Sequence, residues 1–206
     1  MGRPGGRAFR FWKFAMKLVI LDRDGTINED SADFVKSPSE WEPLPGALEG
    51  IARLNHAGWH VVVATNQSGL GRGLFDVASL NAMHAKMHTM LAAVGGRVDA
   101  VFYCPHAPDE GCRCRKPEPG LFEQIGERYG ISLKDVPAVG DAPRDLVSAV
   151  AAGCAPHLVL TGKAAIYRDR SLPEGYPADT VVHHDLAAFA EYIVMQDVRP
   201  SQAADL

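Results

Sequence analysis

Lys17-Leu18-Val19-Ile20-Leu21, followed directly by Asp22-Arg23-Asp24-Gly25-Thr26, indicates the fold more clearly than any other stretch. The apolar, partly β-branched run predicts a buried parallel strand. Alternate residues of an extended chain point the same way, so Asp22 and Asp24 project together from the carboxyl end of this strand. Two adjacent carboxylates repel, and a divalent cation between them relieves that repulsion. We therefore expect a magnesium-dependent carboxylate nucleophile with a second carboxyl as proton carrier; a solvated acidic turn is the alternative.

The composition narrows the class of protein. The chain has 206 residues, 47% of them hydrophobic and 22% charged, which is typical of one soluble globular domain. The formal net charge of −4 argues against general nucleic-acid binding and against an anionic membrane surface. No apolar run approaches the roughly 20 residues that span a bilayer. We expect a cytoplasmic monomer with a small-molecule substrate and with neither a nucleic-acid nor a membrane partner.

The two ends of the chain differ from its middle. Residues 1–15 carry basic residues but no apolar core and no small-residue cleavage site, so a secretory signal is not indicated. We expect this segment to be a disordered extension before a start at Met16. Residues 16–197 are expected to form a single domain, and residues 198–206 a frayed tail.

Apolar runs alternate with amphipathic stretches along the chain. Strands are predicted at Leu18–Asp22, His60–Thr65, Val98–Tyr103, Val136–Gly140, His157–Thr161 and Thr180–His183. Helices are predicted at Pro45–His56, Asp76–Val94, Pro119–Tyr129, Arg144–Ala152 and Leu186–Met195. This alternation predicts an α/β fold with a doubly wound, mainly parallel sheet and helices on both faces.

The spacing between the predicted strands leaves no room for a separate cap domain. The residues between Asp24 and Thr65, and between Thr65 and Lys116, are needed for loops, helices and strands. The site should therefore be open, and its specificity should come from three loops, at Asn28–Glu42, Gln67–Phe75 and Cys104–Pro117.

Polar side chains follow further predicted strands. Thr65-Asn66-Gln67-Ser68 supplies hydroxyl and amide donors for phosphoryl oxygens, and Arg115-Lys116 supplies cations. Asp141 supplies another carboxylate, with Arg144 and Asp145 just beyond it. Each of these groups is a weak signal of function by itself, because such residues often occur as helix caps, in turns or as solvated surface charges. Their placement at successive strand ends nevertheless predicts a phosphoryl-transfer site.

This pattern resembles the haloacid dehalogenase superfamily of aspartyl phosphotransferases, on Asp22-x-Asp24-Gly25-Thr26, Thr65, Lys116 and Asp141. The resemblance implies that Asp22 attacks phosphorus and that Asp24 donates and then accepts a proton. It implies that Mg²⁺ is held by the Asp22 and Asp141 side chains and by the Asp24 backbone carbonyl. Lys116 would neutralise charge on the phosphoryl oxygens, together with Thr65 and Asn66.

Three of the four cysteines cluster near Lys116. Cys104, His106, Cys112 and Cys114 form two i, i+2 pairs that can close a tetrahedral site, and this ligand set suits structural Zn²⁺. A Cys112–Cys114 disulfide would be strained, and free buried thiols are the remaining alternative. Because the site ends directly at Arg115-Lys116, zinc would hold the phosphate-binding cations in position.

The zinc loop narrows the resemblance. Four segments together resemble the D-glycero-D-manno-heptose 1,7-bisphosphate 7-phosphatases. They are Asp-Arg-Asp-Gly-Thr-Ile-Asn, Thr-Asn-Gln-Ser-Gly-Leu-Gly-Arg-Gly, Cys-Pro-His and Cys-x-Cys-Arg-Lys-Pro. These phosphatases are capless, magnesium-dependent enzymes of bacterial heptose biosynthesis. The resemblance implies a sugar bisphosphate substrate, with Ser68 bonding a sugar hydroxyl and Arg72 and Arg115 meeting the distal phosphate. Gln67 and Asp30 would complete the substrate-binding set.

Two alternatives remain open. The short zinc loop and Asp30-Ser31-Ala32-Asp33-Phe34 also resemble the histidinol-phosphate phosphatases, in which Glu29, Asp30 and Asp33 would receive an ammonium group. A non-enzymatic zinc-clipped module that binds phosphate or a partner is the second alternative, which hydrolysis of p-nitrophenyl phosphate would exclude. His84 and His88 lie four residues apart on a predicted helix, and we interpret them as the flank of its buried methionine stripe.

Overall fold

The computed structural model describes residues 16–198 of the chain. The expected extension at residues 1–15 and residues 199–206 of the expected tail lie outside the described residues. The last helix continues to Val198, the residue at which the tail was expected to begin.

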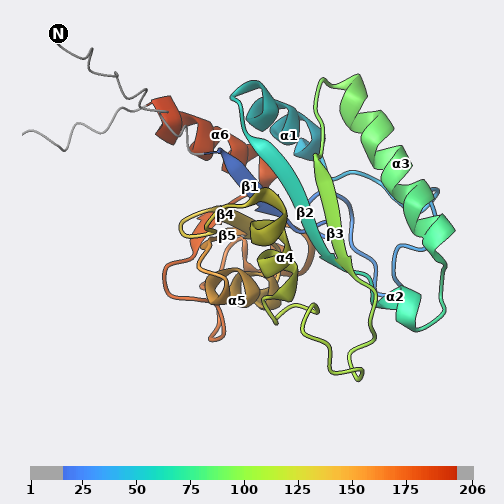
Figure 1. The fold of residues 1–206 in the computed structure, drawn as a ribbon. Helices are drawn as coiled ribbons and strands as arrows, with labels where there is room; N and C mark the ends of the chain where they lie inside the picture. Colours follow the sequence, from blue (N-terminus) through green and yellow to red (C-terminus); the bar gives the residue numbers. More distant parts are fainter. Residues whose placement is uncertain (1–15, 199–206) are drawn as a thin grey trace, which may run out of the picture.

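A six-stranded parallel sheet forms the centre of the molecule (Figure 1). Its strands are β1 (Leu18–Leu21), β2 (His60–Asn66), β3 (Ala100–Cys104), β4 (Pro137–Gly140), β5 (Ala155–Val159) and β6 (Val181–His183). The spatial order is β3-β2-β1-β4-β5-β6, so the chain reverses its direction of travel across the sheet between β1 and β4. The predicted doubly wound α/β fold is confirmed. In such sheets, ligands bind at the carboxyl ends of the strands that flank the reversal.

Helices cover both faces of this sheet. They are α1 (Ala47–His56), α2 (Ser68–Gly71), α3 (Val77–Ala93), α4 (Gly120–Tyr129), α5 (Pro143–Ala151) and α6 (Leu186–Val198), with a 3₁₀ helix η1 (Gly162–Tyr167). Figure 1 shows α1, α3 and α6 on one side of the sheet and α4 and α5 on the other. The alternation of strand side chains explains the two layers: Val19 and Leu21 pack in the cluster that includes α1, α3 and α6, and Leu18 and Ile20 in the cluster that includes α4.

Helix α3 places one side of its length in the core. Asp76 caps its amino end by accepting a hydrogen bond from the Ser79 backbone N–H at 2.7 Å. Of the predicted stripe Met83, Met87, Met90 and Val94, the first two are fully buried and the last two only partly buried. His88 is exposed. His84 lies beside this stripe and contacts the loop after β1 through Arg23.

The element boundaries differ from the sequence-based expectation by small amounts. Strand β5 begins two residues earlier than predicted, because Ala155 and Pro156 already pair with β4. Helices α2 and η1 were not predicted, because segments of four and six residues are too short to display a helical repeat. Both short helices follow strands directly, α2 after β2 and η1 after β5.

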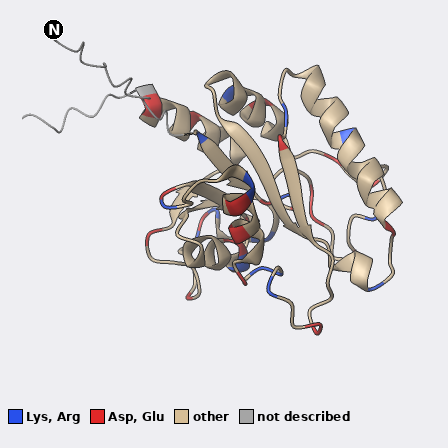
Figure 2. Ribbon diagram, in the orientation of Figure 1, with Lys and Arg blue, Asp and Glu red and all other residues tan. Residues whose placement is uncertain are grey.

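Charged residues of both signs are intermixed over the helices and loops (Figure 2). Among the helices of residues 16–198, we find none with the length and apolar character needed to cross a membrane.

Candidate active site

Three carboxylates meet where β1 and β4 end. Asp22 follows β1, Asp141 follows β4, and Asp145 lies in the first turn of α5. The Asp22 backbone N–H donates to the Val139 carbonyl at 2.8 Å, which joins the two strand ends. Carboxylate oxygens of the three residues lie within 4.8 Å of one another, and all three residues are buried. We call Asp22, Asp141 and Asp145 the carboxylate cluster.

Arg144 Nε lies 3.8 Å from Asp145 Oδ1, and Lys116 makes closer ion pairs with this cluster. Its Nζ lies 2.7 Å from Asp22 Oδ1 and 2.8 Å from Asp145 Oδ1, and it donates to the Ala64 carbonyl at 2.8 Å. Burial favours the neutral amine, but the charges of Asp145 and Asp22 outweigh it and raise the pKa of Lys116. Lys116 is therefore charged at neutral pH, and its ammonium contacts both carboxylates.

The charges of Lys116 and Arg144 do not fully compensate the three carboxylates of the cluster. Burial raises the pKa of Asp22 to about 6 although Lys116 opposes this shift. Burial, and then the Asp145 and Asp22 charges, raise the pKa of Asp141 to about 8. Asp141 Oδ1 is buried with no hydrogen-bond partner among the described residues. Converging carboxylate oxygens whose negative charge is only partly compensated are the donor set that Mg²⁺ prefers, so these residues fit a magnesium ion.

Backbone segments without side chains surround Asp141. Gly25 and Gly162 have positive φ angles of 85° and 47°, and a Cβ atom at either position would overlap the Asp141 carboxylate. The Lys163 backbone N–H donates to Asp141 Oδ2 at 2.6 Å, and Thr161 Oγ1 donates to the Gly25 carbonyl at 2.7 Å. The segment after β5 therefore holds one oxygen of Asp141 in place.

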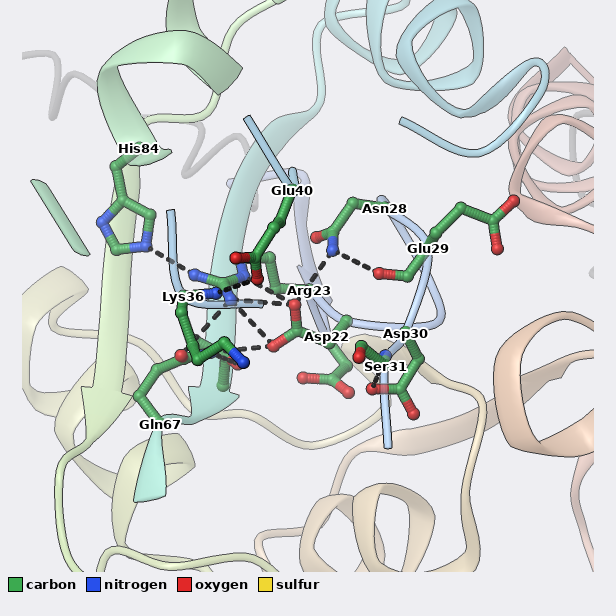
Figure 3. A network of polar contacts seen from close by, with 12 residues as sticks. Asp22, Arg23, Asn28, Glu29, Asp30, Ser31, Lys36, Glu40, Gln67 and His84 are labelled. Carbon is green, nitrogen blue, oxygen red and sulfur yellow. Dashed lines mark hydrogen bonds and ion pairs between the residues drawn. The ribbon is translucent and has the colours of Figure 1, made fainter. Parts of the chain in front are cut away.

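Asp24 is held in a separate hydrogen-bond network with Arg23, Asn28 and Gln67, three residues that Figure 3 shows close together. Its Oδ1 accepts from Arg23 Nη2 at 2.8 Å and from Asn28 Nδ2 at 2.9 Å, and its Oδ2 accepts from Arg23 Nη2 and Gln67 Nε2, both at 2.9 Å. Burial alone would raise the pKa of Asp24, but the Arg23 charge and these hydrogen bonds lower it below its ordinary value. The carboxyl group is thus ionised and fixed in orientation.

Two predicted phosphate donors have partners within the protein. Asn66 Nδ2 donates to the Lys116 carbonyl, and Asn66 Oδ1 accepts from the Lys116 backbone N–H, both at 3.0 Å. This amide therefore clamps the Lys116 backbone, and its contact with phosphoryl oxygens stays a prediction. Gln67 Nε2 likewise donates to Asp24 and to Thr65 Oγ1, both at 2.9 Å, so its amide supports the site from within.

A cavity of about 460 Å³ opens beside Asp22 and Asp24. All of the predicted substrate-binding residues line it: Asp30, Thr65, Asn66, Gln67, Ser68, Arg72, Arg115 and Lys116. The Arg72 guanidinium lies 5.6 Å from the centre of the Phe34 ring, which joins the loop after β1 to the segment after α2. Asp30 does not stand free, because its carboxylate pairs with Lys163.

Four residues of the site had no predicted role. Of the two that the sequence places just beyond Asp141, Arg144 lines the cavity and Asp145 completes the carboxylate cluster. Lys163 also lines the cavity, and Arg23 supports Asp24. A sequence signal for a role exists for two of the four. Arg23 lies between two carboxylates on the opposite side of an extended segment, and Asp145 lies one helical turn after Asp141. Lys163 had no such signal, because its position depends on the unpredicted helix η1.

The four predicted zinc ligands converge in the loop after β3. The Sγ atoms of Cys104, Cys112 and Cys114 and the Nδ1 atom of His106 lie 3.0–3.6 Å apart in the pairs in contact. A tetrahedron with Zn–ligand bonds of about 2.0–2.3 Å has edges of roughly 3.3–3.8 Å, so this cysteine cluster fits Zn²⁺. The cysteines are free rather than paired in disulfides.

The loop that carries the cysteine cluster contacts both sides of the cavity. Arg115 and Lys116 follow Cys114 directly. The Gln67 backbone N–H donates to the Cys104 carbonyl at 2.8 Å, and the Gly71 N–H donates to the Pro105 carbonyl at 2.9 Å. The loop thus positions α2 as well as the cationic segment.

Comparisons with known proteins agree with this geometry. Residues 113–189 match a family model described as HAD-hydrolase-like. The D-glycero-beta-D-manno-heptose-1,7-bisphosphate 7-phosphatase of Bordetella bronchiseptica is 59% identical over 181 residues, which cover 88% of this chain and 99% of that protein. The protein of the same name from Pseudomonas aeruginosa is 51% identical, covering 86% and 97%.

Two solved structures share the fold. The D,D-heptose 1,7-bisphosphate phosphatase of B. bronchiseptica, complexed with magnesium and phosphate, has a TM-score of 0.84 at 58% identity and covers 88% of this chain and 99% of that one. The enzyme of that name from Burkholderia thailandensis has a TM-score of 0.67 at 52% identity, covering 86% and 98%. The chain therefore belongs to the D-glycero-β-D-manno-heptose-1,7-bisphosphate 7-phosphatase family of haloacid dehalogenase-like hydrolases.

Proposed function

We propose that this protein removes the 7-phosphate of D-glycero-D-manno-heptose 1,7-bisphosphate through an aspartyl-phosphate on Asp22, with Mg²⁺ as catalytic and Zn²⁺ as structural ion. The observation that supports this most strongly is the Asp22 carboxylate, which is buried beside Lys116 and Asp141 and lines a cavity rich in cations. The family of the chain supports the same substrate.

In the first half of the reaction, Asp22 attacks phosphorus and the ester bond to the C7 oxygen breaks. Asp24 gives its proton to that departing oxygen. Asp24 is ionised in the free protein, and the approach of a phosphate dianion raises its pKa because two negative charges then lie close together. General-acid assistance of this kind contributes about 10²–10⁴-fold to the rate.

In the second half, Asp24 accepts a proton from water as the water oxygen attacks phosphorus. The bond between Asp22 and phosphorus breaks, and inorganic phosphate leaves. The Lys116 ammonium, 2.7 Å from Asp22, offsets the charge of the phosphoryl oxygens in both halves. Thr65 and Ser68, which line the cavity, donate hydroxyl hydrogens to the substrate.

The Asp22 and Asp141 side chains and the Asp24 backbone carbonyl would hold Mg²⁺, with Asp145 close by. When bound, the ion reduces the repulsion between the nucleophilic carboxylate and the phosphate dianion. Cys104, His106, Cys112 and Cys114 would hold Zn²⁺ with all four positions filled by protein, which leaves a structural role.

The charge of the cavity favours a substrate with two phosphates. Of the cations that line it, Lys116, Arg144 and Lys163 pair with carboxylates of the site, whereas Arg72 and Arg115 form no ion pair among the described residues. Two such arginines suit a second phosphate at the far end of the sugar. The histidinol alternative needs a free carboxylate for an ammonium group. Of its three candidates, Glu29, Asp30 and Asp33, only Asp30 lines this cavity, and it is paired with Lys163.

The test compares kcat/KM for heptose 1,7-bisphosphate with that for histidinol phosphate, with Mg²⁺ and Zn²⁺ present. We expect the bisphosphate to win by more than about tenfold, which is about 1.4 kcal/mol of transition-state preference. A preference for histidinol phosphate contradicts the substrate. If the protein hydrolyses none of heptose 1,7-bisphosphate, histidinol phosphate and p-nitrophenyl phosphate, the proposal that it is an enzyme is contradicted.

A further inference from the structure

Arg23 is a buried charge behind the proposed proton carrier. Its side chain is 1% exposed and lies between the loop after β1 and helix α3. Nε and Nη2 both donate to Asp24, at 3.1 Å and 2.8 Å, and Nη2 also donates to Gln67 Oε1 at 3.3 Å. A guanidinium offers its donors in one fixed plane, so these contacts set the orientation of the carboxylate that they share.

The remaining nitrogen of Arg23 points to a residue far away in sequence. Nη1 lies 3.3 Å from Nε2 of His84, which projects from α3 (Figure 3). Because a guanidinium has donors only, it is Arg23 that donates and His84 Nε2 that accepts. Burial, with the nearby Arg23 charge, lowers the pKa of His84 to about 4, so the ring is neutral and its Nε2 is free to accept.

We propose that His84 and Arg23 form a positioning relay, in which His84 fixes the plane of the Arg23 guanidinium and Arg23 thereby holds the Asp24 carboxyl on the line of the leaving oxygen. Neither residue contacts the reacting atoms, so both are positioning residues. This inference rests on the proposed function, because it assigns a task to Asp24 as proton donor. It gives His84 a role beyond the helix flank that the sequence indicates.

The relay predicts a particular kinetic defect. A misplaced acid slows the departure of a poor leaving group, the C7 alkoxide, and hardly affects a good one such as 2,4-dinitrophenolate, which leaves without a proton. The parameter to compare is kcat/KM, because it covers the steps up to leaving-group release and excludes hydrolysis of the aspartyl-phosphate. If His84 had only a structural role, its substitution would lower kcat/KM by the same factor for the poor and for the good leaving group.

The experiment uses the full chain with Mg²⁺ and Zn²⁺ and three variants. His84→Phe keeps the ring volume and removes the acceptor, His84→Gln keeps an acceptor, and His88→Phe makes the same change one turn away at an exposed position. For His84→Phe we expect kcat/KM to fall about tenfold or more with heptose 1,7-bisphosphate and less than about twofold with 2,4-dinitrophenyl phosphate. Most of the loss should lie in kcat rather than KM.

His84→Gln should recover most of the lost kcat/KM, and His88→Phe should match the wild type with both esters. Equal losses on the two esters, no loss at all, or the same loss in His88→Phe overturns the relay. If His84→Phe does not fold, His84→Leu takes its place and is compared with His84→Gln in the same way. An equal loss of kcat/KM on both esters in His84→Leu again overturns the relay. A wild-type protein that hydrolyses neither ester overturns the proposed function, and the relay with it.

Discussion

The carboxylate cluster and the cysteine cluster are both suited to a metal ion, yet their positions are fixed in different ways. Asp22 and Asp141 directly follow adjacent central strands and are 5% and 0% exposed. In the cysteine cluster only Cys104 belongs to a strand, and the other three ligands lie in the loop and are partly exposed. The sheet therefore preforms the first cluster, whereas we expect the second to need a bound ion to keep its geometry.

The largest difference between the clusters should appear when one ligand of the first is changed. Asp22→Asn removes the nucleophile but keeps the side-chain volume, so we expect kcat to fall by at least about 10⁴-fold with an unchanged far-UV circular dichroism spectrum. Asp33→Asn, which does not line the cavity, is the matched control and should retain activity. Near-normal phosphate release by Asp22→Asn would remove Asp22 from its proposed role.

A ligand change in the cysteine cluster should affect both stability and activity. Cys112→Ser should lose zinc, lower Tm by about 10 °C or more and reduce kcat/KM about tenfold, because a structural zinc site contributes several kcal/mol and this loop positions Lys116. The measurements are zinc content, thermal unfolding and phosphatase activity. Cys154→Ser is the control: it changes a buried thiol in the core and should keep its zinc. A zinc-free Cys112→Ser variant with a normal Tm would contradict the expectation that the cysteine cluster needs its ion for stability.

The backbone around the carboxylate cluster should be sensitive to a single methyl group. Gly162→Ala puts a Cβ against the Asp141 carboxylate, so we expect the Mg²⁺ concentration for half-maximal activity to rise about tenfold. Gly58→Ala also changes a glycine of positive φ, 85°, but its Cβ would enter open space. It should cost about 1–2 kcal/mol of stability without changing the Mg²⁺ requirement. Equal Mg²⁺ requirements in the two variants would show that Asp141 tolerates the contact.

The smallest expected effect is a pH dependence of magnesium binding. The folded pKa values of Asp22 and Asp141, about 6 and about 8, lie above their ordinary 3.8. Considered alone, these two carboxyls bind more protons in the folded protein without metal than in the unfolded chain, so their contribution to stability falls as pH rises from 3.8 to about 8. Mg²⁺ competes with those protons.

Saturation with Mg²⁺ at 100 times its Kd should therefore raise Tm by about 5–10 °C at pH 8, from a linkage of about 2.7 kcal/mol, and the same concentration should raise it by less than half as much at pH 5. Differential scanning fluorimetry measures both values. Asp141→Asn should reduce the difference between the two pH values. A larger Mg²⁺ effect at pH 5 than at pH 8 would contradict the raised pKa values.

Much of the fold could be predicted because its signals are local. Buried strands appear as short apolar runs, and helices α1, α3, α4 and α5 were placed to within two residues at each end. Strand β5 was placed two residues late because its pairing with β4, and not its own hydrophobicity, defines its start. The short helices α2 and η1 have too few residues for a periodic pattern.

The candidate site was predictable in its membership and less so in its internal contacts. Asp22, Asp24 and Asp141 lie just after their strands, whereas Lys116 lies well beyond the end of β3 and was placed by the family resemblance. The Cys/His spacing was enough for the cysteine cluster. The partner of each polar side chain was not predictable. Asn66 clamps the Lys116 backbone, Asp30 pairs with Lys163, and Arg23 contacts His84.

Patterns within a few residues thus account for the α/β class, the ligand types and the order of the chemical groups along the chain. They do so because strand alternation, turn chemistry and metal preference act over short distances. The orientation of Asp24, the pairing of Asp30 and the placement of His84 arise only after folding. The Gln67 contact with Asp24 spans 43 residues of sequence, the His84 contact with Arg23 spans 61, and the Lys163 contact with Asp30 spans 133. Contacts at such separations depend on how the whole chain packs, and no local repeat encodes them.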